Sequence, residues 1–225
     1  MDRRHLTLRL PLPRPREVLG TVVALGVAGL PVARAWGLQW GAREDELDAT
    51  LPGDDLTPDA DLVATRAIGV AARPQDVWPW LVQIGQGRGG FYSYDALENL
   101  VGCDIRSADR VEPAWQDLAV GDVVRLHPAK GLDVAVVDPG RALVLRGPDA
   151  PAGAAPPPYG FSWAFVLRPD PRGGTRVVVR ERYVYTSAAS RLVAEPSCLL
   201  STVMTRGMLR GLRARVLAGA EGSAG

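Results

Sequence analysis

A carboxylate in an apolar strand is the clearest chemical signal in this sequence. Glu181 follows Val177 and Val179 at a spacing of two, so the three side chains share one strand face. An unpaired carboxylate on a buried face is costly. Glu181 must therefore pair with an arginine, for which Arg180 and Arg182 are at hand, or carry a raised pKa and face a ligand. We favour a structural ion pair. A bulge in the strand would instead turn the two arginines inward.

Groups for acid–base catalysis are few. A cyclase or dehydratase that works without a cofactor needs a general acid or base in an apolar pocket. The candidates for that role are Glu181, Tyr183, His127 and Arg180. His127 precedes Pro128 and is also typical of a surface turn. Nucleophilic catalysis has little support, because Asp104 would raise the pKa of the neighbouring Cys103 thiol.

Aromatic side chains could form the wall of an apolar cavity. Phe161, Trp163 and Phe165 alternate with smaller residues and therefore share one strand face. Cavities for small molecules are lined mainly by such side chains, although plain core packing explains each of them as well. The predicted ligand-binding residues are Trp78, Trp80, Tyr92, Tyr94, Phe161, Trp163, Phe165, Tyr183, Met204 and Met208.

These residues lie on a series of predicted elements. A strand over 62–70 precedes a helix that opens at Pro74 and a second short helix from about Ser93 to Val101. Turn signals then separate five strands over 123–126, 132–137, 142–145, 161–167 and 175–185. A mobile loop is expected over Pro148–Pro158.

A long helix from about Glu195 to Ala218 ends the series. Its predicted buried stripe consists of Leu200, Val203, Met204, Met208, Leu212 and Val216. The order of elements predicts an α+β fold. In this fold a curved antiparallel sheet of about six or seven strands surrounds the C-terminal helix, with two short helices after the first strand.

The first 40 residues combine a basic start with an uncharged stretch. Residues 1–35 contain six arginines, and no charge occurs from Val18 to Ala33. Sixteen helical residues cover about 24 Å, and extension to Trp40 would cross a hydrocarbon core of about 30 Å. We therefore expect a membrane anchor over residues 18–40, with the domain outside the cytoplasm. The alternatives are a cleaved signal peptide with a secreted domain, or a helix packed on a cytoplasmic domain.

Residues 41–61 form an acidic segment with eight carboxylates and one arginine. Because prolines and a glycine interrupt it, we interpret it as a solvated linker at the edge of the domain. The carboxylates lack the spacing of a calcium loop. Two Cys cannot form a four-ligand zinc site alone, and two His argue against a His-rich metal site, so no metal is expected. The folded domain then spans 62–218, with a flexible tail over 219–225.

Six sequence stretches resemble one protein family. The run Trp78–Asp95, WPWLVQIGQGRGGFYSYD, is similar to a bacterial group within the START-related superfamily, to which polyketide cyclases and lipid-transfer domains belong. Five further stretches resemble the same group, so the resemblance covers about residues 38–217. They are Trp40–Ala42, Ser107–Arg110, Trp115–Leu118, Arg141–Leu145 and Met204–Arg210. The resemblance implies a helix-grip fold, and some members carry an N-terminal membrane segment. The superfamily contains both binding proteins and enzymes, so it does not define the function.

The composition narrows the functional classes. With 26 basic and 25 acidic residues the net charge is +1, which argues against nucleic-acid binding. We expect a membrane-associated protein that binds or carries a small hydrophobic ligand, lipid-like or polyketide-like, in an internal cavity. One alternative is a cyclase or dehydratase without a cofactor; another is a membrane-tethered interaction module with a filled core. The sequence does not indicate the oligomeric state.

Overall fold

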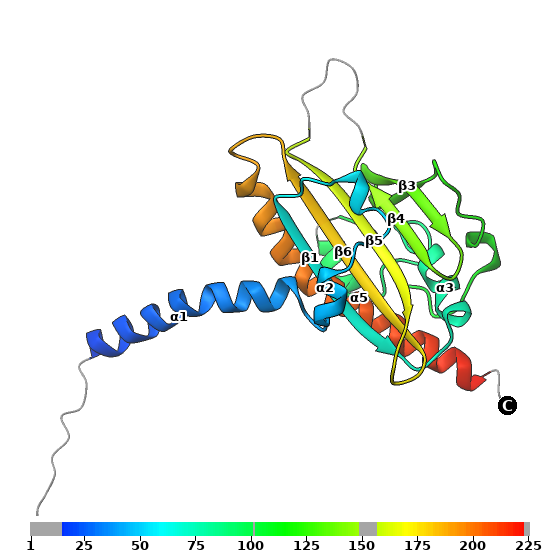
Figure 1. Cartoon of the computed structure of the whole chain (residues 1–225), viewed down its shortest axis with the longest axis horizontal. Coiled ribbons are helices and arrows are strands. Elements are labelled where there is room, and N and C mark those ends of the chain that lie inside the picture. The colour runs from blue at the N-terminus through cyan, green and yellow to red at the C-terminus, as the bar shows by residue number, and fades with distance from the viewer. Residues whose placement is uncertain (1–14, 101, 149–156, 223–225) are drawn as a thin grey trace, which may run out of the picture. The chain divides into compact units, whose positions relative to one another are not determined.

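The computed structural model of the chain describes residues 15–100, 102–148 and 157–222 (Figure 1). It divides into two units, residues 1–36 and residues 37–225. The first unit contains most of helix α1 (Pro15–Leu38). Among the described residues, no helix is long and apolar enough to cross a membrane, so the predicted anchor over 18–40 gains no support here. The basic residues 1–14 and, of the loop predicted over Pro148–Pro158, residues 149–156 lie outside the described part.

Six antiparallel strands form one sheet in the order β1-β6-β5-β4-β3-β2. Their bounds are β1 Leu62–Val70, β2 Val123–His127, β3 Lys130–Asp138, β4 Ala142–Arg146, β5 Tyr159–Pro169 and β6 Thr175–Tyr185. The predicted bounds of β1 and β6 are confirmed to the residue, and the other four strands are slightly longer than predicted. Every consecutive pair from β2 to β6 is adjacent, and β1 closes the order by pairing with the last strand.

Short helices surround the sheet. They are α2 (Glu44–Asp48), α3 (Pro74–Val82), α4 (Asp95–Leu100) and 3-10 turns at Asp54–Leu56 and Pro113–Trp115. Helix α3 begins as predicted, with Pro74 at its first position. There the Asp76 carboxylate accepts the Arg73 backbone N–H, which supplies a partner for a free donor at the helix start.

Helix α5 (Arg191–Gly222) crosses one face of the curved sheet, which we call the inner face (Figure 1). It extends past the predicted end at Ala218, so residues 219–222 are helical, and the flexibility of the tail stays a prediction. The predicted buried stripe is correct for Met208, Leu212 and Val216. It is wrong for Leu200 and Val203, which are 64% and 49% exposed, because the buried side of the first half of α5 consists of Ala194, Cys198 and Thr205.

Apolar clusters cover both faces of the sheet. On the inner face, residues of β3 to β6 pack with α3 and with Met208, Leu209 and Leu212 of α5. On the other face, which we call the outer face, Val144, Val166 and Val178 pack beneath Leu51 of the acidic segment. The six-stranded antiparallel sheet and its long C-terminal helix confirm the predicted α+β helix-grip fold.

Candidate functional site

Glu181 belongs to a buried polar network between β1, β6 and α5. Its Oε1 atom lies 3.0 Å from Nη1 of Arg66, and both side chains are buried. The same oxygen accepts hydrogen bonds from the hydroxyls of Thr205, at 3.1 Å, and Ser201. Oε2 accepts the Tyr183 hydroxyl at 3.0 Å. The predicted ion pair is therefore confirmed, and it explains how an apolar face holds a carboxylate.

The partner of Glu181 is nevertheless not one of the flanking arginines. In the antiparallel register Ala64 lies opposite Glu181, so Arg66, two residues along β1, reaches it diagonally on the same face. Arg180 and Arg182 point to the outer face, as strand alternation requires. No bulge interrupts β6, so the alternative with inward arginines is wrong.

Arg66 also joins the network to the rest of the domain. Its Nε donates to the Gly37 carbonyl at 2.8 Å, and its Nη2 donates to Thr202 Oγ1 at 2.8 Å. Burial and the nearby Glu181 carboxylate raise the pKa of Tyr183, which keeps its hydroxyl protonated. Because every oxygen of Glu181 has a donor, the arrangement is that of a structural network rather than of a free acid or base.

Most of the predicted aromatic set gathers on the inner face. Trp80, Tyr92, Trp163, Phe165 and Met208 belong to one buried cluster, with Trp78 and Phe161 packed against it. Tyr183 belongs to a neighbouring cluster that Phe161 also contacts. Met204 is half-buried on α5, and Tyr94 is exposed. The assignment of these residues to a ligand stays a prediction.

These rings contact one another directly. The ring centroids of Trp163 and Phe165 are 4.6 Å apart, and those of Phe161 and Tyr183 are 4.9 Å apart. Phe91, which the sequence analysis did not select, lies 6.3 Å from Trp163. Trp163 Nε1 is buried and has no hydrogen-bond partner among the described residues. An indole N–H is normally paired when it is buried, so this donor is unusual.

Glu98 of α4 is a second unusual group, and the sequence analysis missed it. The residue is 7% exposed, and its Oε2 atom has no hydrogen-bond partner in the described part of the chain. Burial and the charge of Asp95 raise the pKa of Glu98 to about 7. The two leucines of the same short helix, Leu97 and Leu100, are exposed. Since an amphipathic pattern would place the leucines inside and Glu98 outside, the sequence carries no signal for this arrangement.

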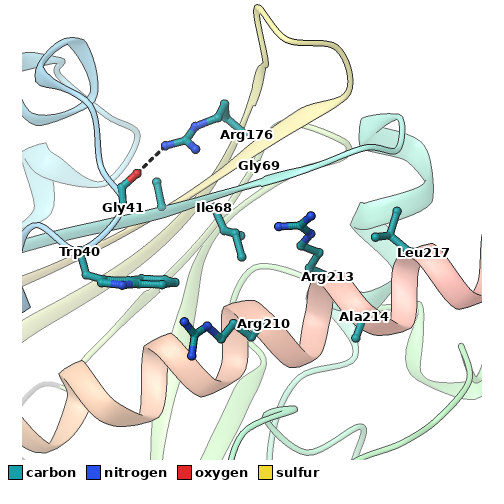
Figure 2. Close-up of a pocket in the computed structure, with 10 residues that line it drawn as sticks. Trp40, Gly41, Ile68, Gly69, Arg176, Arg210, Arg213, Ala214 and Leu217 are labelled. Atoms are coloured by element: carbon teal, nitrogen blue, oxygen red, sulfur yellow. Dashed lines mark hydrogen bonds between the residues drawn. The ribbon is translucent and has the colours of Figure 1, made fainter.

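Two pockets of the structure lie away from the predicted aromatic set. One, of about 540 Å³, lies between β1 and α5 and is lined by Trp40, Gly41, Ala67, Ile68, Gly69, Arg176, Arg210, Arg213, Ala214 and Leu217 (Figure 2). The other, of about 380 Å³, is lined by residues 106–110 with Glu112 and Trp115. Neither is lined by any residue that the sequence analysis assigned to ligand binding.

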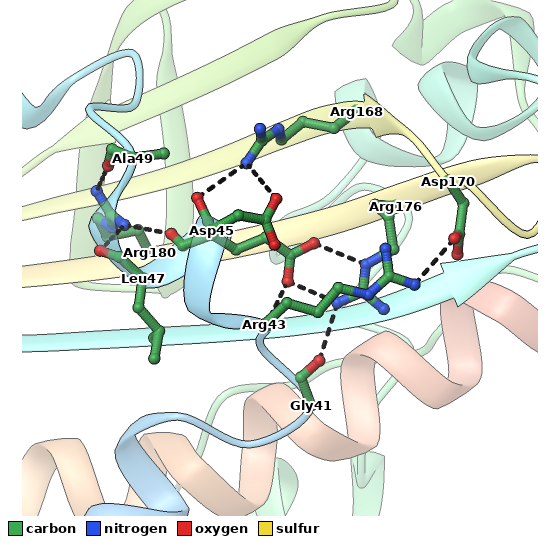
Figure 3. A network of polar contacts seen from close by, with 10 residues as sticks. Gly41, Arg43, Asp45, Leu47, Ala49, Arg168, Asp170, Arg176 and Arg180 are labelled. Atoms are coloured by element: carbon green, nitrogen blue, oxygen red, sulfur yellow. Dashed lines mark hydrogen bonds and ion pairs between the residues drawn. The ribbon is translucent and has the colours of Figure 1, made fainter.

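Arg180 lies on the outer face, where it holds the acidic segment (Figure 3). Its Nη1 donates to the Ala49 carbonyl at 2.7 Å and to Asp54 Oδ2 at 2.6 Å, and its Nη2 donates to the Glu46 carbonyl at 2.7 Å. These bonds occupy the guanidinium, and the sheet separates it from Glu181. Arg180 is thus placed as a structural residue.

The acidic segment is not a solvated linker at these positions. Glu46 is 2% exposed and lies 2.6 Å from the Arg176 guanidinium. Burial tends to raise the pKa of Glu46, but the bonds from Arg176 and from the Arg43 N–H outweigh it and lower that pKa. The interpretation from composition is wrong for Glu46 and Asp54, because arginines on the outer face of β6 pair with them.

His127 lies at the far edge of the sheet from Glu181. It is half-buried on β2, and its Nδ1 accepts the Ala129 N–H at 3.1 Å, as in a turn. Three strands, β5, β4 and β3, separate β2 from β6 in the sheet order. The structure therefore brings Glu181 and Tyr183 together, and it leaves His127 and Arg180 apart from them. Across residues 15–100, 102–148 and 157–222, no group of three or more His, Cys, Asp or Glu could hold a metal ion.

A six-stranded antiparallel sheet with a long C-terminal helix across one face defines a helix-grip domain. No family model and no curated protein matches the chain. Three solved structures give the scale of the structural similarity. A Mesorhizobium loti protein matches at 15% identity and TM-score 0.40, over 69% of this chain and 96% of its own. A Nitrosomonas europaea protein matches at 14% identity and TM-score 0.41, over 70% of this chain and 96% of its own.

The third structure is the di-domain ARO/CYC protein StfQ from the steffimycin biosynthetic pathway. It matches at 14% identity and TM-score 0.42, over 75% of this chain and 55% of its own. Identities and TM-scores this low carry no argument about what the present chain binds or does.

Proposed function

We propose that the domain binds a small, mainly apolar ligand between the inner face of the sheet and α5. The observation that carries this proposal is the buried Trp163 Nε1, which has no acceptor among the described residues. An unpaired buried donor costs about 1–3 kcal/mol. A ligand with an acceptor oxygen would pair with this donor, while the surrounding rings of Phe91 and Phe165 would contact its apolar part.

The chemistry of this wall suggests the class of ligand. Aromatic rings with one inward N–H suit a lipid-like or polyketide-like molecule, in which a carbonyl or hydroxyl oxygen interrupts an apolar skeleton. Binding would require the packed rings to separate. No cofactor is part of this proposal.

The proposal is tested first by native mass spectrometry of the full-length protein purified from its own host. A co-purifying small molecule with an apolar skeleton and an oxygen acceptor is the expected result. Protein that is free of ligand and also fails to take up apolar fluorescent probes would favour the interaction module with a filled core.

A conservative variant then tests the role of the indole. Trp163→Phe removes the N–H and keeps an aromatic ring. We expect weaker binding of a ketone-bearing fluorescent probe and little change for a hydrocarbon probe. Trp36→Phe, at a half-exposed position of α1, is the matched control. Equal losses for both probes would mean that only packing had changed.

A second candidate function is a cyclase or dehydratase that works without a cofactor. Glu98 favours it, since a buried carboxyl with a pKa of about 7 can give and accept protons near neutral pH. Glu98→Gln should then remain folded, bind the co-purified molecule and lose turnover. Retained turnover in that variant would remove Glu98 from the mechanism.

Association with a membrane through residues 18–40 is part of the proposal as well. Its support is the absence of charged residues from Val18 to Ala33 in the sequence. An N-terminal amphipathic or apolar helix can hold a domain at a membrane without crossing it. A cleaved signal peptide and a cytoplasmic location are the competing outcomes of the fractionation described below.

A further inference from the structure

One row of residues on the exposed side of helix α5 is apolar in its first part and basic in the rest. Residues Leu199, Val203, Arg206, Arg210 and Arg213 follow at alternating spacings of four and three, so they lie in one row. The first two are apolar and about half exposed, at 53% and 49%. The remaining three are arginines. We call this row the α5 stripe.

Trp40 borders the basic half of the α5 stripe. The guanidinium carbons of Arg206 and Arg210 lie 5.4 and 5.5 Å from the centroid of the Trp40 ring. The Ala67 N–H donates to the Trp40 carbonyl at 3.1 Å, which fixes this residue against strand β1. The larger pocket thus has one wall on β1 and another on α5, with the indole at one end (Figure 2).

The pocket has an excess of positive charge. Its ten lining residues include Arg176, Arg210 and Arg213 and no carboxylate. Arg176 is neutralised by Glu46, whereas neither Arg210 nor Arg213 forms an ion pair within the described residues. A second acid near the pocket, Asp170 beside Gly69, is paired with Arg43 at 2.9 Å. Two exposed guanidinium groups therefore remain for an outside anion.

Apolar surface continues from the pocket in two directions. Inside it, Ile68 offers an aliphatic contact on the side of the Trp40 indole, and Leu217 offers one at the other end of the pocket (Figure 2). Outside it, Val203 and Leu199 extend the α5 stripe toward the start of the helix. Arg210 is the eleventh residue after Leu199, which corresponds to about 16 Å along a helix axis.

We propose that this pocket and the α5 stripe bind one molecule of an anionic amphiphile, an alkyl carboxylate or alkyl phosphate. Its charged group contacts Arg210 and Arg213, because guanidinium groups form charge-assisted, bidentate bonds with such oxygens. Its alkyl chain lies along Val203 and Leu199. A concave pocket between β1 and α5 holds a single head group. This favours a single free amphiphile molecule as the ligand over a flat membrane surface. The site shares no residue with the proposed inner site and does not rest on it.

Calorimetric titration of the full-length protein tests the proposal. The probes are decyl phosphate below its micelle concentration, inorganic phosphate and decanol. We expect one decyl phosphate to bind per chain, and both fragments to bind at least about tenfold more weakly, since each lacks half of the contacts. The double variant R210Q/R213Q should lose at least about tenfold in affinity for decyl phosphate. The matched control is Arg172→Gln, which removes one exposed arginine from the β5–β6 turn.

Three results would overturn the proposal. They are equal affinity of R210Q/R213Q and the parent protein, equal affinity for decyl phosphate and decanol, and binding to phosphatidylglycerol vesicles with none to decyl phosphate monomers. Should the double variant not fold, as judged by circular dichroism, Arg213→Gln alone replaces it. Arg213 is exposed and makes no ion pair in the described structure, so this change leaves the fold intact.

Discussion

Arg66 and Glu181 face each other across β1 and β6 at 3.0 Å, and neither side chain reaches solvent. Each has its remaining polar atoms bonded to other parts of the domain. Arg66 holds the Gly37 carbonyl at the end of α1, and Glu181 holds two hydroxyls of α5. The pair and its hydrogen bonds therefore connect strands β1 and β6 to helix α5, which packs on them.

Removing the charge of Glu181 should lower the free energy of unfolding of the domain. In Glu181→Gln the buried guanidinium of Arg66 loses its counter-charge, which costs about 3–5 kcal/mol. Urea denaturation followed by circular dichroism measures the loss. The double variant R66M/E181L, which removes both charges, should recover most of it. If Glu181→Gln unfolds at the same urea concentration as the parent protein, the pair does not support the fold.

Truncation of Trp163 should affect both stability and binding. Trp163→Ala removes a large ring from the inner cluster, and such changes cost about 3–5 kcal/mol. On the folded fraction, it should alter uptake of an apolar fluorescent probe far more than Arg172→Ala, a change on the surface. Identical probe binding by the two variants would contradict a ligand site on the inner face.

Glu98 should make stability fall as the pH rises. Its folded pKa, about 7, lies above the value of about 4.3 that an unfolded chain gives, so the folded state binds the proton more tightly. The stability that protonated Glu98 contributes to the folded state is complete below about pH 4.3 and is lost as the pH rises through 7. Urea midpoints at pH 5 and pH 7.5 should therefore differ more for the parent protein than for Glu98→Gln. Parallel midpoints would mean that Glu98 titrates normally.

The folded domain should begin near residue 37 and not at residue 62. Deletion of residues 1–36 leaves the bonds of Gly37, Glu46 and Asp54 intact, whereas deletion of residues 1–61 removes the partners of Arg176 and Arg180. We expect the shorter deletion to give a cooperative thermal transition and the longer one to aggregate. Equal melting temperatures for the two truncated proteins would show that the acidic segment adds nothing.

Cell fractionation tests the N-terminal segment. The full-length protein should sediment with membranes, and the chain without residues 1–36 should not. Intact full-length protein in the soluble cytosolic fraction would reject membrane association. A mature N-terminus at Trp36 would establish a cleaved signal, since Ala33-Arg34-Ala35 matches a cleavage sequence.

Local patterns predicted the strands and not their partners. The alternation of apolar residues, bounded by turn signals, predicted the bounds of β1 and β6 to the residue. The apolar face of β6 also required a charge partner for Glu181. That partner is Arg66, because β1 and β6 pair although most of the domain separates them in sequence. Sequence spacing offered only the adjacent arginines.

The acidic segment and one face of α5 were misread for related reasons. Eight acids among turn-forming residues are typical of a solvated linker, and only the outward direction of Arg176 and Arg180 reveals the partners of Glu46 and Asp54. Leu200 and Val203 have the spacing of buried residues, yet both are exposed. Hydrophobic periodicity indicates that a helix has an apolar side and does not state what, if anything, covers it.

The pairing of β1 with β6 also governs how the chain can fold during synthesis. Strand β1 emerges early from the ribosome, but its neighbour in the sheet and the helix α5 emerge last. Until then the guanidinium of Arg66 has no carboxylate, and the edges of the partial sheet are unpaired. Such long-range closure slows folding and leaves strand edges open to other chains. Ribosome-bound chains that end before β6 should consequently depend on chaperones far more than completed ones.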